Sequence, residues 1–268
     1  MREALRGTVY RDVSGYLHIF GLVQYVWSNC RGGILRISAI SFDGDMTLWD
    51  FRKVMRHSLK KALAELRRLV PTQDAAVLTV EEMIAIRNKI EEDEQGRTWN
   101  HEELRLLAFE QTLESIGSPD RDLAVHLNEL YLKHRFEDIE LYPDVIPALD
   151  RLAPHFKLGL LSNGNSYPER CGLEGRFAFV VFSQDVQVRK PDRRIFEIAA
   201  REAGCSLDEL LHVGDSFEND VMGAHGAGAK TVWLNREGME SDAEVKPDVE
   251  ITSLADLPGV LGLGQNGN

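Results

Sequence analysis

Four groups of polar residues in this sequence have the types and spacing needed to act on a doubly negative tetrahedral group. They are residues 43–47 (DGDMT), residues 162–163 (SN), Lys190 and residues 215–220 (DSFEND). Several carboxylates placed close together are unfavourable without a cation, and oxygen-only ligands suit Mg²⁺. A metal ion, one ammonium and neutral hydrogen-bond donors would together suit a phosphoryl group.

Each group taken alone has a simpler explanation. A DxD such as residues 43–45 is commonly a turn with solvated carboxylates, and Ser162-Asn163 is typical of a turn. Lys190 alone is typical of a protein surface, and Gly214-Asp215 could cap the helix that follows. Because all four groups occur in order within an α/β pattern of strands, we expect them to act together.

Short apolar runs predict the strands that position these groups. Residues 34–42 (ILRISAISF) predict one buried strand that ends against Asp43. Four further strands are expected at residues 156–162, 179–182, 210–213 and 230–234, separated by helices near residues 144–153, 191–204 and 218–228. Pro191 is expected as the first residue of its helix. This alternation predicts an α/β fold with a doubly wound, Rossmann-like parallel sheet, in which ligands bind beyond the carboxyl ends of the strands.

A helical block separates the first predicted strand from the others. Apolar residues recur at spacings of three and four after Phe51, and the helix they predict stops at Pro71. Three more helices are expected around residues 83–90, 104–113 and 123–131. We therefore expect a core domain of residues 34–49 and 141–260, with an all-helical insertion at residues 50–140.

The two ends of the chain are expected to lie outside this core. Residues 1–33 form an N-terminal extension with no assigned role. Its apolar stretch lacks the small-x-small cleavage site of a signal peptide. Residues 261–268 (LGLGQNGN) are expected to be a frayed tail.

The composition of the 268-residue chain excludes several classes of protein. The 31 basic and 43 acidic residues give a net charge of −12, which argues against a nucleic-acid-binding protein that acts through its overall field. The 3 cysteines are widely spaced and typical of neither a disulfide framework nor a zinc site. No apolar run reaches the roughly 18 residues of a membrane span. We expect a cytoplasmic protein with no nucleic-acid or membrane partner, and its oligomeric state is open.

Four segments resemble the motifs of the haloacid dehalogenase (HAD) superfamily. They are residues 42–50 (FDGDMTLWD), 161–165 (LSNGN), 189–197 (RKPDRRIFE) and 212–228 (HVGDSFENDVMGAHGAG). The resemblance covers about residues 36–257, and the first motif is especially similar to that of the phosphatase branches. The helical insertion is similar to the cap that the superfamily inserts after its first motif, which would close over the site.

The resemblance implies the chemical roles of the motif residues. Asp43 would be the nucleophile that forms an aspartyl-phosphate, and Asp45 the general acid that later activates water as a base. Lys190 would bind the phosphate and offset its charge and that of the nucleophile. Thr47, Ser162 and Asn163 would bind the phosphoryl oxygens or hold the surrounding loop.

The resemblance also implies a Mg²⁺ site. Asp43, the backbone carbonyl of Asp45, and Asp215 would hold the ion, with Asp220 supporting it directly or through water. One residue departs from the family pattern. Many relatives carry glycine before the motif threonine, whereas this chain has Met46, which would alter the turn and the entry to the pocket.

The leading hypothesis is a Mg²⁺-dependent phosphatase acting on a small phosphorylated metabolite through an aspartyl-phosphate. A hydrolytic 2-haloacid dehalogenase is the first alternative, and Asp45 argues against it because a carbon–halogen bond needs no general acid there. A phosphomutase with the same aspartates, or a non-catalytic binding module on this scaffold, are further alternatives. The sequence does not identify the substrate.

Two features of the helical block have both a structural and a functional interpretation. The basic residues between Arg52 and Arg68 form either a solvated helix face or a surface that attracts phosphorylated substrates. Trp99, Asn100 and His101 could face the pocket, although the start of a helix is the favoured position for Asn100.

Overall fold

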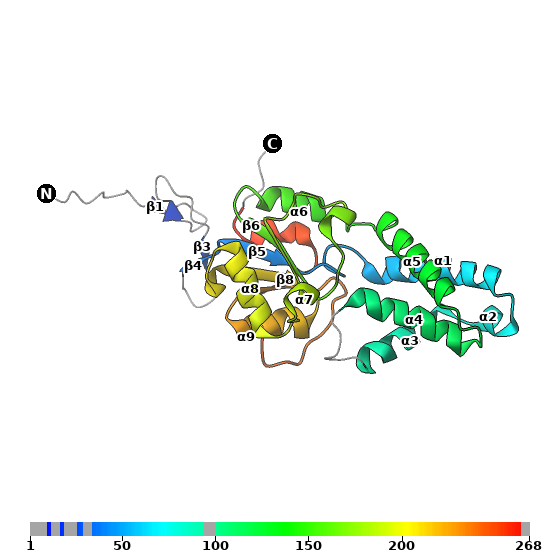
Figure 1. The fold of residues 1–268 in the computed structure, drawn as a ribbon. Coiled ribbons are helices and arrows are strands. Elements are labelled where there is room, and N and C mark those ends of the chain that lie inside the picture. Colours follow the sequence, from blue (N-terminus) through cyan, green and yellow to red (C-terminus); the bar gives the residue numbers. More distant parts are fainter. Residues whose placement is uncertain (1–9, 12–16, 19–25, 29–33, 94–99, 264–268) are drawn as a thin grey trace.

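The described part of the chain consists of residues 10–11, 17–18, 26–28, 34–93 and 100–263 of a computed structural model. Figure 1 shows two main parts, a sheet flanked by helices and a bundle formed by the helices between residues 51 and 137. Among the described helices, none has the length and apolar content that a bilayer crossing requires.

The central sheet contains six parallel strands in the order β10-β9-β8-β5-β6-β7. They are β5 (Ala39–Phe42), β6 (Lys157–Ser162), β7 (Phe179–Phe182), β8 (Leu210–Gly214), β9 (Lys230–Leu234) and β10 (Val249–Ile251). β5 pairs with both β6 and β8, so that Phe42 lies opposite Leu160 on one side and Val213 on the other. The carboxyl ends of these three central strands therefore lie side by side. The sequence did not predict β10, a three-residue edge strand.

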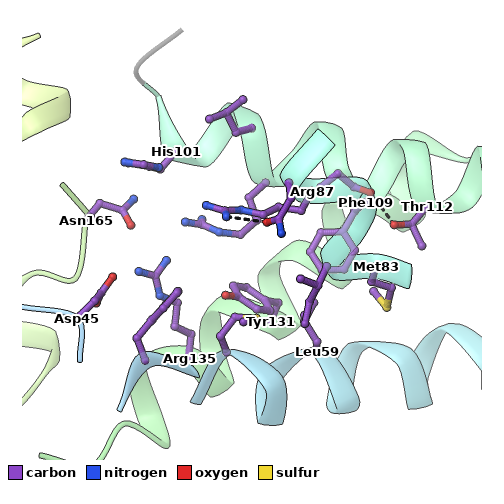
Figure 2. A pocket seen from close by; sticks show the side chains of 18 residues that line it. Asp45, Leu59, Met83, Arg87, His101, Phe109, Thr112, Tyr131, Arg135 and Asn165 are labelled. Atoms are coloured by element: carbon purple, nitrogen blue, oxygen red, sulfur yellow. Dashed lines mark hydrogen bonds between the residues drawn. The ribbon is translucent and has the colours of Figure 1, made fainter. Parts of the chain in front are cut away.

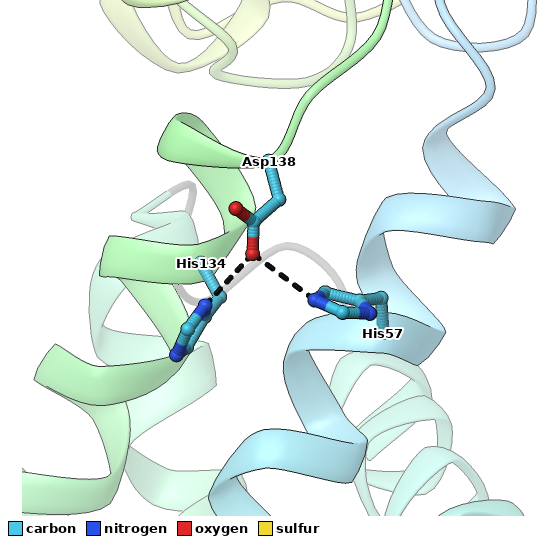
Figure 3. A group of neighbouring side chains, drawn as sticks. All are labelled: His57, His134 and Asp138. Carbon is cyan, nitrogen blue, oxygen red and sulfur yellow. Dashed lines mark hydrogen bonds and ion pairs between the residues drawn. The ribbon is translucent and has the colours of Figure 1, made fainter.

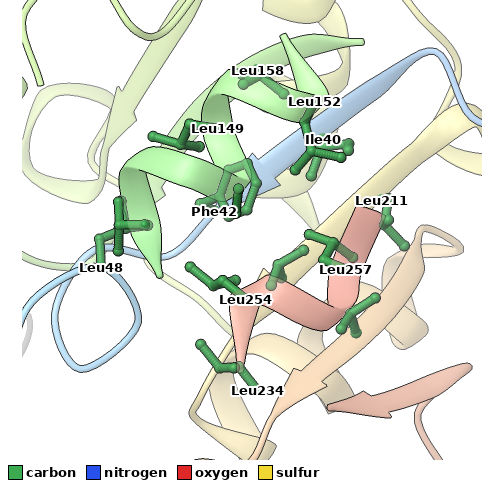
Figure 4. Packing of buried hydrophobic residues seen from close by; sticks show 14 of the residues in the cluster. Ile40, Phe42, Leu48, Leu149, Leu152, Leu158, Leu211, Leu234, Leu254 and Leu257 are labelled. Carbon is green, nitrogen blue, oxygen red and sulfur yellow. The ribbon is translucent and has the colours of Figure 1, made fainter. Parts of the chain in front are cut away.

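Helices cover both faces of the sheet, because successive strand residues point to opposite sides. On one face, Ile40 and Phe42 pack against α6 (Val145–Leu152), η4 (Leu254–Asp256) and α10 (Leu257–Val260), as Figure 4 shows. On the other face, Ala39 and Leu161 pack against α8 (Arg193–Ala203) and α9 (Gly223–Ala227). The predicted doubly wound α/β fold is confirmed. The shorter elements η1 (Pro168–Arg170), α7 (Ser183–Val186) and η2 (Leu207–Glu209) lie in the connections.

The prediction of one strand over residues 34–42 is wrong. Ile34–Arg36 form β4, which pairs antiparallel with β3 (Val26–Ser28), and only β5 joins the central sheet. The chain changes partners at Ser38, whose N–H donates to the Glu209 carbonyl at 2.9 Å. Isoleucines occur on both sides of Ser38, so the sequence gave no signal that the strand is interrupted there. β1 (Tyr10–Arg11) and β2 (Leu17–His18) form a separate antiparallel pair, and the rest of residues 1–33 lies outside the described residues.

Two helices begin differently from the prediction. Pro191 is not the first residue of α8, because Asp192 is the N-cap and its carboxylate accepts from the N–H of Arg194 at 2.9 Å. The helix expected at residues 218–228 begins as a π-helical turn, η3 (Phe217–Met222), before α9. Ser216 caps this turn by accepting from the N–H of Asn219, so Gly214-Asp215 does not serve as the cap.

Among the described residues, five helices lie between β5 and α6 and form the inserted bundle. They are α1 (Phe51–Leu69), α2 (Gln73–Val77), α3 (Val80–Asp93), α4 (His101–Ser115) and α5 (Arg121–Glu137), of which α2 was not expected. The bundle has its own apolar core, which includes Leu66, Leu113 and Leu127. Asn100 caps α4 by accepting from the N–H groups of Glu102 and Glu103, which confirms the role favoured for it. The domain boundaries themselves stay a prediction.

The carboxyl-terminal segment is packed for longer than expected. Leu261 and Leu263 are buried in the core layer formed with α6 and α10. The side chain of Arg151 also donates to the Leu263 carbonyl at 3.0 Å. The frayed tail predicted from residue 261 is therefore wrong for residues 261–263, and residues 264–268 lie outside the described residues.

Candidate active site

A buried lysine joins two aspartates at the carboxyl ends of the central strands. Nζ of Lys190 donates to Oδ1 of Asp43 and to Oδ1 of Asp220, each at 2.6 Å, and to the Leu161 carbonyl at 3.0 Å. Only 2% of the Lys190 side chain is exposed. Burial alone would lower the pKa of Lys190, but Asp220 and Asp43 raise it above its ordinary value. The lysine is therefore held as an ammonium whose three donors are all used.

Three carboxylates meet beside this lysine. One oxygen from each of Asp43, Asp215 and Asp220 lies within 4.8 Å of the other two. Burial raises the pKa of Asp43 well above its usual range, although Lys190 opposes the shift. Burial and the charge of Asp220 raise the pKa of Asp215 to about 6. Since one ammonium does not offset this crowding, the oxygen-only donor set fits a divalent ion such as Mg²⁺.

Asp220 is fixed in its charged form by neighbours on every side. Its Oδ1 accepts from Lys190 and from Nε2 of His212 at 3.1 Å, and its Oδ2 accepts from the N–H of Ser216 at 2.9 Å. Burial would raise the pKa of Asp220, but Lys190 and His212 lower it below its ordinary value. Burial also lowers the pKa of His212, so its Nε2–H donates as the neutral ring while Nδ1 lies 2.8 Å from Oγ of Ser41.

Asp45 differs from these aspartates because it lines a cavity and is not among the partners of Lys190. Its Oδ1 accepts from Nε1 of Trp49 at 2.7 Å and lies 3.4 Å from Oγ of Ser166. Its Oδ2 faces Gly164, where an added Cβ would lie only 2.8 Å away. Asp45 is therefore held by neutral donors through one oxygen, which leaves the other oxygen toward the cavity.

The other predicted site residues lie around the aspartates. Oγ1 of Thr47 donates to Oδ1 of Asp215 at 3.1 Å. Oγ of Ser162 accepts from the N–H of Gly164 at 3.0 Å and so holds the loop that faces Asp45. Asn163 uses both ends of its amide on the backbone of Lys190, accepting at 2.8 Å and donating at 3.0 Å. This geometry makes Asn163 a positioning residue for the lysine.

The turn around Met46 has the backbone conformation that the family pattern predicts for glycine. Met46 has a φ of 66°, in the left-handed region that residues other than glycine rarely adopt. Its N–H donates to the Trp49 carbonyl at 2.8 Å, which closes the turn. At Gly44 an added Cβ would lie 2.9 Å from the Trp49 ring, so a side chain there would disturb the tryptophan that holds Asp45.

The cavity beside Asp45 lies between the inserted bundle and the core. It contains about 840 Å³ of empty space, open solvent included. Figure 2 shows Asp45, Asn165 and His101 at one end, Arg135 next to them, and Leu59, Phe109 and Met83 further into the bundle. Nε2 of His101 lies 2.8 Å from the Asn163 carbonyl, and burial lowers the pKa of His101. The ring therefore links the bundle to the core as a neutral donor, as expected for a residue facing the pocket, while Trp99 lies outside the described residues.

The sequence interpretation missed the residues that support the aspartates. His212 is a polar residue within the apolar strand β8, and this position was the available signal. Trp49 and Ser166 support Asp45. Trp49 lies within the first quoted motif, where it was given no role, and Ser166 lies one residue after the second. Arg105 and Arg135 line the cavity from α4 and α5 and carried no sequence signal, because charged residues are common on helices.

The basic residues at the start of the bundle form a solvated helix face. Lys53 pairs with Glu140 at 2.6 Å, and its side chain is 67% exposed. Arg56 pairs with Glu81 and Arg68 with Glu65 on the same exposed surface. None of these cations lines the cavity among the described residues. The structural interpretation of this run is therefore the better one.

A second group of possible metal ligands lies on the bundle, among the described residues of α1 and α5. Nε2 of His57 and Nδ1 of His134 approach the same oxygen of Asp138, at 3.0 and 2.8 Å, as Figure 3 shows. His134, more than His57, lowers the pKa of Asp138. The three groups are half-exposed and satisfy one another, so they join the end of α5 to α1 without any further ligand.

Comparison with known proteins identifies several related sequences. A family model described as haloacid dehalogenase-like hydrolase matches residues 37–228. The glyceraldehyde 3-phosphate phosphatase of Methanopyrus kandleri is 30% identical over 237 residues, which is 84% of this chain and 97% of that protein. The 5-amino-6-(5-phospho-D-ribitylamino)uracil phosphatase YigB of Escherichia coli is 28% identical, with 84% of this chain and 97% of that protein covered.

Solved structures give a similar result. A structure described as 2-haloacid dehalogenase, from Pseudomonas syringae pv. Tomato DC3000, is 33% identical and superposes with a TM-score of 0.72. The match covers 84% of this chain and 98% of that one. The relatives thus include both phosphatases and a dehalogenase.

Proposed function

This chain belongs to the haloacid dehalogenase-like hydrolases, and we propose that it is a Mg²⁺-dependent phosphatase that hydrolyses a small phosphomonoester through an aspartyl-phosphate. The observation that carries this proposal is the different surroundings of two nearby carboxylates. Asp43 lies against the Lys190 ammonium, whereas Asp45 is held by Trp49 and faces the cavity. Two carboxylates with different environments can divide the roles of nucleophile and acid.

The first step uses Asp43 as the nucleophile. Its Oδ1 is bound to Lys190, so Oδ2, which accepts no hydrogen bond from the described residues, attacks phosphorus. The phosphorus bond to the substrate oxygen breaks as the new bond forms. Asp45 gives its Oδ2 proton to that oxygen, and the leaving group departs as a neutral alcohol into the cavity.

The second step returns the protein to its starting state. Asp45, now a carboxylate, takes a proton from water while the water oxygen attacks phosphorus. The bond between phosphorus and Asp43 breaks, which releases inorganic phosphate and leaves Asp43 ionised and Asp45 protonated. Thr47 and Ser162 hold the two loops, and Asn163 holds Lys190, so that the charged groups need not rearrange between the steps.

Asp43, Asp215 and the backbone carbonyl of Asp45 would hold Mg²⁺, with Asp220 supporting the ion directly or through water. When bound, Mg²⁺ supplies positive charge that allows phosphate and several carboxylates to lie together. Asp220 makes three hydrogen bonds to protein groups, which favours a supporting role for it. The inserted bundle is the cap of this enzyme, and its cavity receives the leaving group.

The dehalogenase alternative is supported by one relative at 33% identity. Asp45 argues against it, because cleavage of a carbon–halogen bond requires no proton donor at that position. A phosphomutase would use the same aspartates. A non-catalytic binding module would not need the contact between Lys190 and the aspartates.

We place the protein in the cytoplasm, with a small phosphorylated metabolite as its substrate.

The test is phosphate release from para-nitrophenyl phosphate. The purified protein should release phosphate with Mg²⁺ and lose this activity in EDTA, and Asp43→Asn should abolish turnover. A matched variant, Asp150→Asn, removes a carboxylate on the outer side of α6, where it pairs with Arg176, and should keep the activity. Equal hydrolysis by wild type and Asp43→Asn would assign the nucleophile elsewhere. Halide release from a 2-haloacid without phosphate release would establish the dehalogenase.

A further inference from the structure

The cavity beside Asp45 is basic although the whole chain is strongly acidic. Among the described residues that line it, Arg87, Arg105 and Arg135 are the cations and Asp45 is the one acid. The chain as a whole has a net charge of −12. The cavity therefore concentrates positive charge at the place where the leaving group of a substrate would lie.

Two of these arginines have no carboxylate partner among the described residues. Arg135 is only 4% exposed, and its Nη2 donates to Oγ of Ser166 at 2.9 Å while its Nε is buried without a hydrogen-bond partner. Nη1 of Arg105 is likewise buried and unpartnered. Burial and the nearby charge of Arg135 lower the pKa of Arg105 to about 10. A guanidinium group that is buried, as in Arg135, or partly buried, as in Arg105, is unfavourable without a counter-ion, because it has lost hydration.

Arg87 lines the same cavity, but a carboxylate offsets its charge. It pairs with Glu91 at 2.9 Å, one turn along α3, and its side chain is 45% exposed. Arg105 and Arg135 instead face aromatic rings, Arg105 over Tyr131 at 5.7 Å and Arg135 over Phe51 at 5.0 Å. Aromatic faces keep the guanidinium planes in place. Nη2 of Arg105 and Nη1 of Arg135 donate no hydrogen bond to the described residues, so these two nitrogens are the donors for an oxyanion.

The position of the two arginines relative to Asp45 defines the part of the substrate that they would contact. Asp45 gives its proton to the leaving oxygen, so the leaving group begins there and extends toward Tyr131 (Figure 2). Further into the bundle than Arg135, the apolar side chains of Leu59, Met83 and Phe109 line the cavity (Figure 2). A leaving group that fills it would have a charged portion beside the arginines and an apolar portion beyond.

We propose that the substrate is a phosphomonoester whose leaving group carries a second oxyanion, a carboxylate or another phosphate, bound by Arg105 and Arg135. This inference rests on the proposed phosphatase function and adds the substrate class. The second anion supplies the counter-charge that the two guanidinium groups lack. It also orients the leaving oxygen toward Asp45, since the anion and the phosphoryl group are then held at two separate places.

The experiment compares aryl phosphates whose para substituents are anionic or neutral. We would measure kcat/KM for para-carboxyphenyl phosphate, for its neutral amide para-carbamoylphenyl phosphate, and for para-phenylene bisphosphate. The carboxylate or the bisphosphate should exceed the amide by about tenfold or more, the usual range for charge-assisted hydrogen bonds. The anionic substrate with the higher kcat/KM then shows whether the second oxyanion is a carboxylate or a phosphate.

Two arginine variants assign the preference to a residue. Arg105→Gln should bring the ratio of anionic to neutral substrate close to one, and Arg105→Lys should restore part of it. Arg87→Gln removes a guanidinium from the same cavity whose charge Glu91 already offsets, and should keep the ratio. Arg135 is a poorer test because it also contacts Ser166 beside Asp45.

Each result supports or overturns the inference. Hydrolysis of all three substrates without an anion preference, or a preference that Arg105→Gln retains, would overturn it while the phosphatase function stands. Absence of hydrolysis for every phosphomonoester would instead overturn the proposed function. If Arg105→Gln does not fold, competitive inhibition of the wild type decides, since para-hydroxybenzoate should inhibit at least about tenfold more strongly than para-hydroxybenzamide.

Discussion

At the scale of single residues, the chemistry depends on how Asp45 is held. Trp49 and Ser166 contact its Oδ1 and no cation touches it among the described residues. The ammonium of Lys190 contacts Asp43 instead, where it opposes the rise in pKa that burial causes. The division of roles between the two aspartates therefore follows from their neighbours, since the two side chains are chemically identical.

Asp45→Asn tests the proton transfer directly. Loss of the acid should reduce kcat/KM for an alkyl phosphate by about a hundredfold or more. The loss should be smaller for para-nitrophenyl phosphate, because nitrophenolate leaves readily without a proton. Steady-state kinetics on both substrates would show the difference. Equal losses on the two substrates would mean that Asp45 acts only in positioning.

Gly164→Ala tests the space around the same carboxylate. The new Cβ would lie 2.8 Å from Oδ2 of Asp45, so the carboxylate must move. We expect kcat/KM to fall by about tenfold to a hundredfold, as for other small displacements of reacting groups. Gly226→Ala is the matched control, because nothing lies within 4 Å of a Cβ there and α9 continues through that position. A Gly164→Ala enzyme as active as Gly226→Ala would contradict the assignment of Oδ2 as the proton donor.

At the scale of the elements, a salt bridge ties the loop that contains Thr47 to the sheet. The terminal nitrogens Nη1 and Nη2 of Arg236 donate to the carboxylate of Asp144, at 2.8 and 2.9 Å. Nη2 also donates to the Thr47 carbonyl at 3.1 Å. Asp144, at the start of α6, further accepts from Oγ of Ser253 and from the N–H of Leu254. One carboxylate thus connects the site loop, α6 and η4.

Asp144→Asn should lower the free energy of unfolding by about 1.5–3 kcal/mol at pH 7, the range for hydrogen bonds to charged groups. Burial opposes the shift, but Arg236 and Ser253 lower the pKa of Asp144 in the folded protein. The stabilisation is therefore present above the unfolded pKa, near 3.9, and is lost as the pH falls through the folded value. Denaturant unfolding of both proteins between pH 7 and pH 3 should show the difference narrowing below about pH 4.

The control for this prediction is a pair on the surface. Glu197→Gln breaks the contact with Arg193 on α8, where both side chains are about half-exposed. Exposed ion pairs contribute little to the free energy of unfolding. This variant should therefore have the same free energy of unfolding as the wild type across the same pH range. A difference for Asp144→Asn that stays constant down to pH 3 would show that its charge is not responsible.

The sequence predicted elements well where one pattern dominates. β7 and β9 have the predicted limits, because each is a short segment rich in β-branched and aromatic residues that a polar residue, Ser183 or Asn235, follows directly. The failures arise from contacts that the local pattern does not show. Residues 34–42 read as one strand, but the N–H of Ser38 donates to Glu209, a residue far along the chain. The π-helical start at Phe217 is set by Ser216 and Asp220 around the site, which a helical period does not reveal.

At the scale of the whole molecule, the sheet brings together residues that are distant in the chain. Asp43 and Lys190 are separated by 147 positions and lie 2.6 Å apart through their side chains. The sequence predicted this meeting because both follow strands of one parallel sheet. It could not predict the cavity, since Arg105 and Arg135 reach it only through the packing of α4 against α5. The contact between the motif residues was thus predictable, and the arginines that line the cavity were not.

Magnesium should also stabilise the folded protein, which can be measured without any turnover. Asp43, Asp215 and Asp220 repel one another, and an ion that binds only the folded state raises stability by mass action. At 100 times its dissociation constant, Mg²⁺ should raise Tm by about 5–10 °C.

The variant Asp215→Asn tests where the ion binds. It should melt at a higher temperature than the metal-free wild type, because one of three crowded charges is gone, and Mg²⁺ should raise its Tm far less. Asp138→Asn, which alters the other ligand group, should keep the wild-type shift, and NaCl at matched ionic strength should not reproduce it. An equal Mg²⁺ shift in Asp215→Asn and the wild type would place the ion away from Asp43.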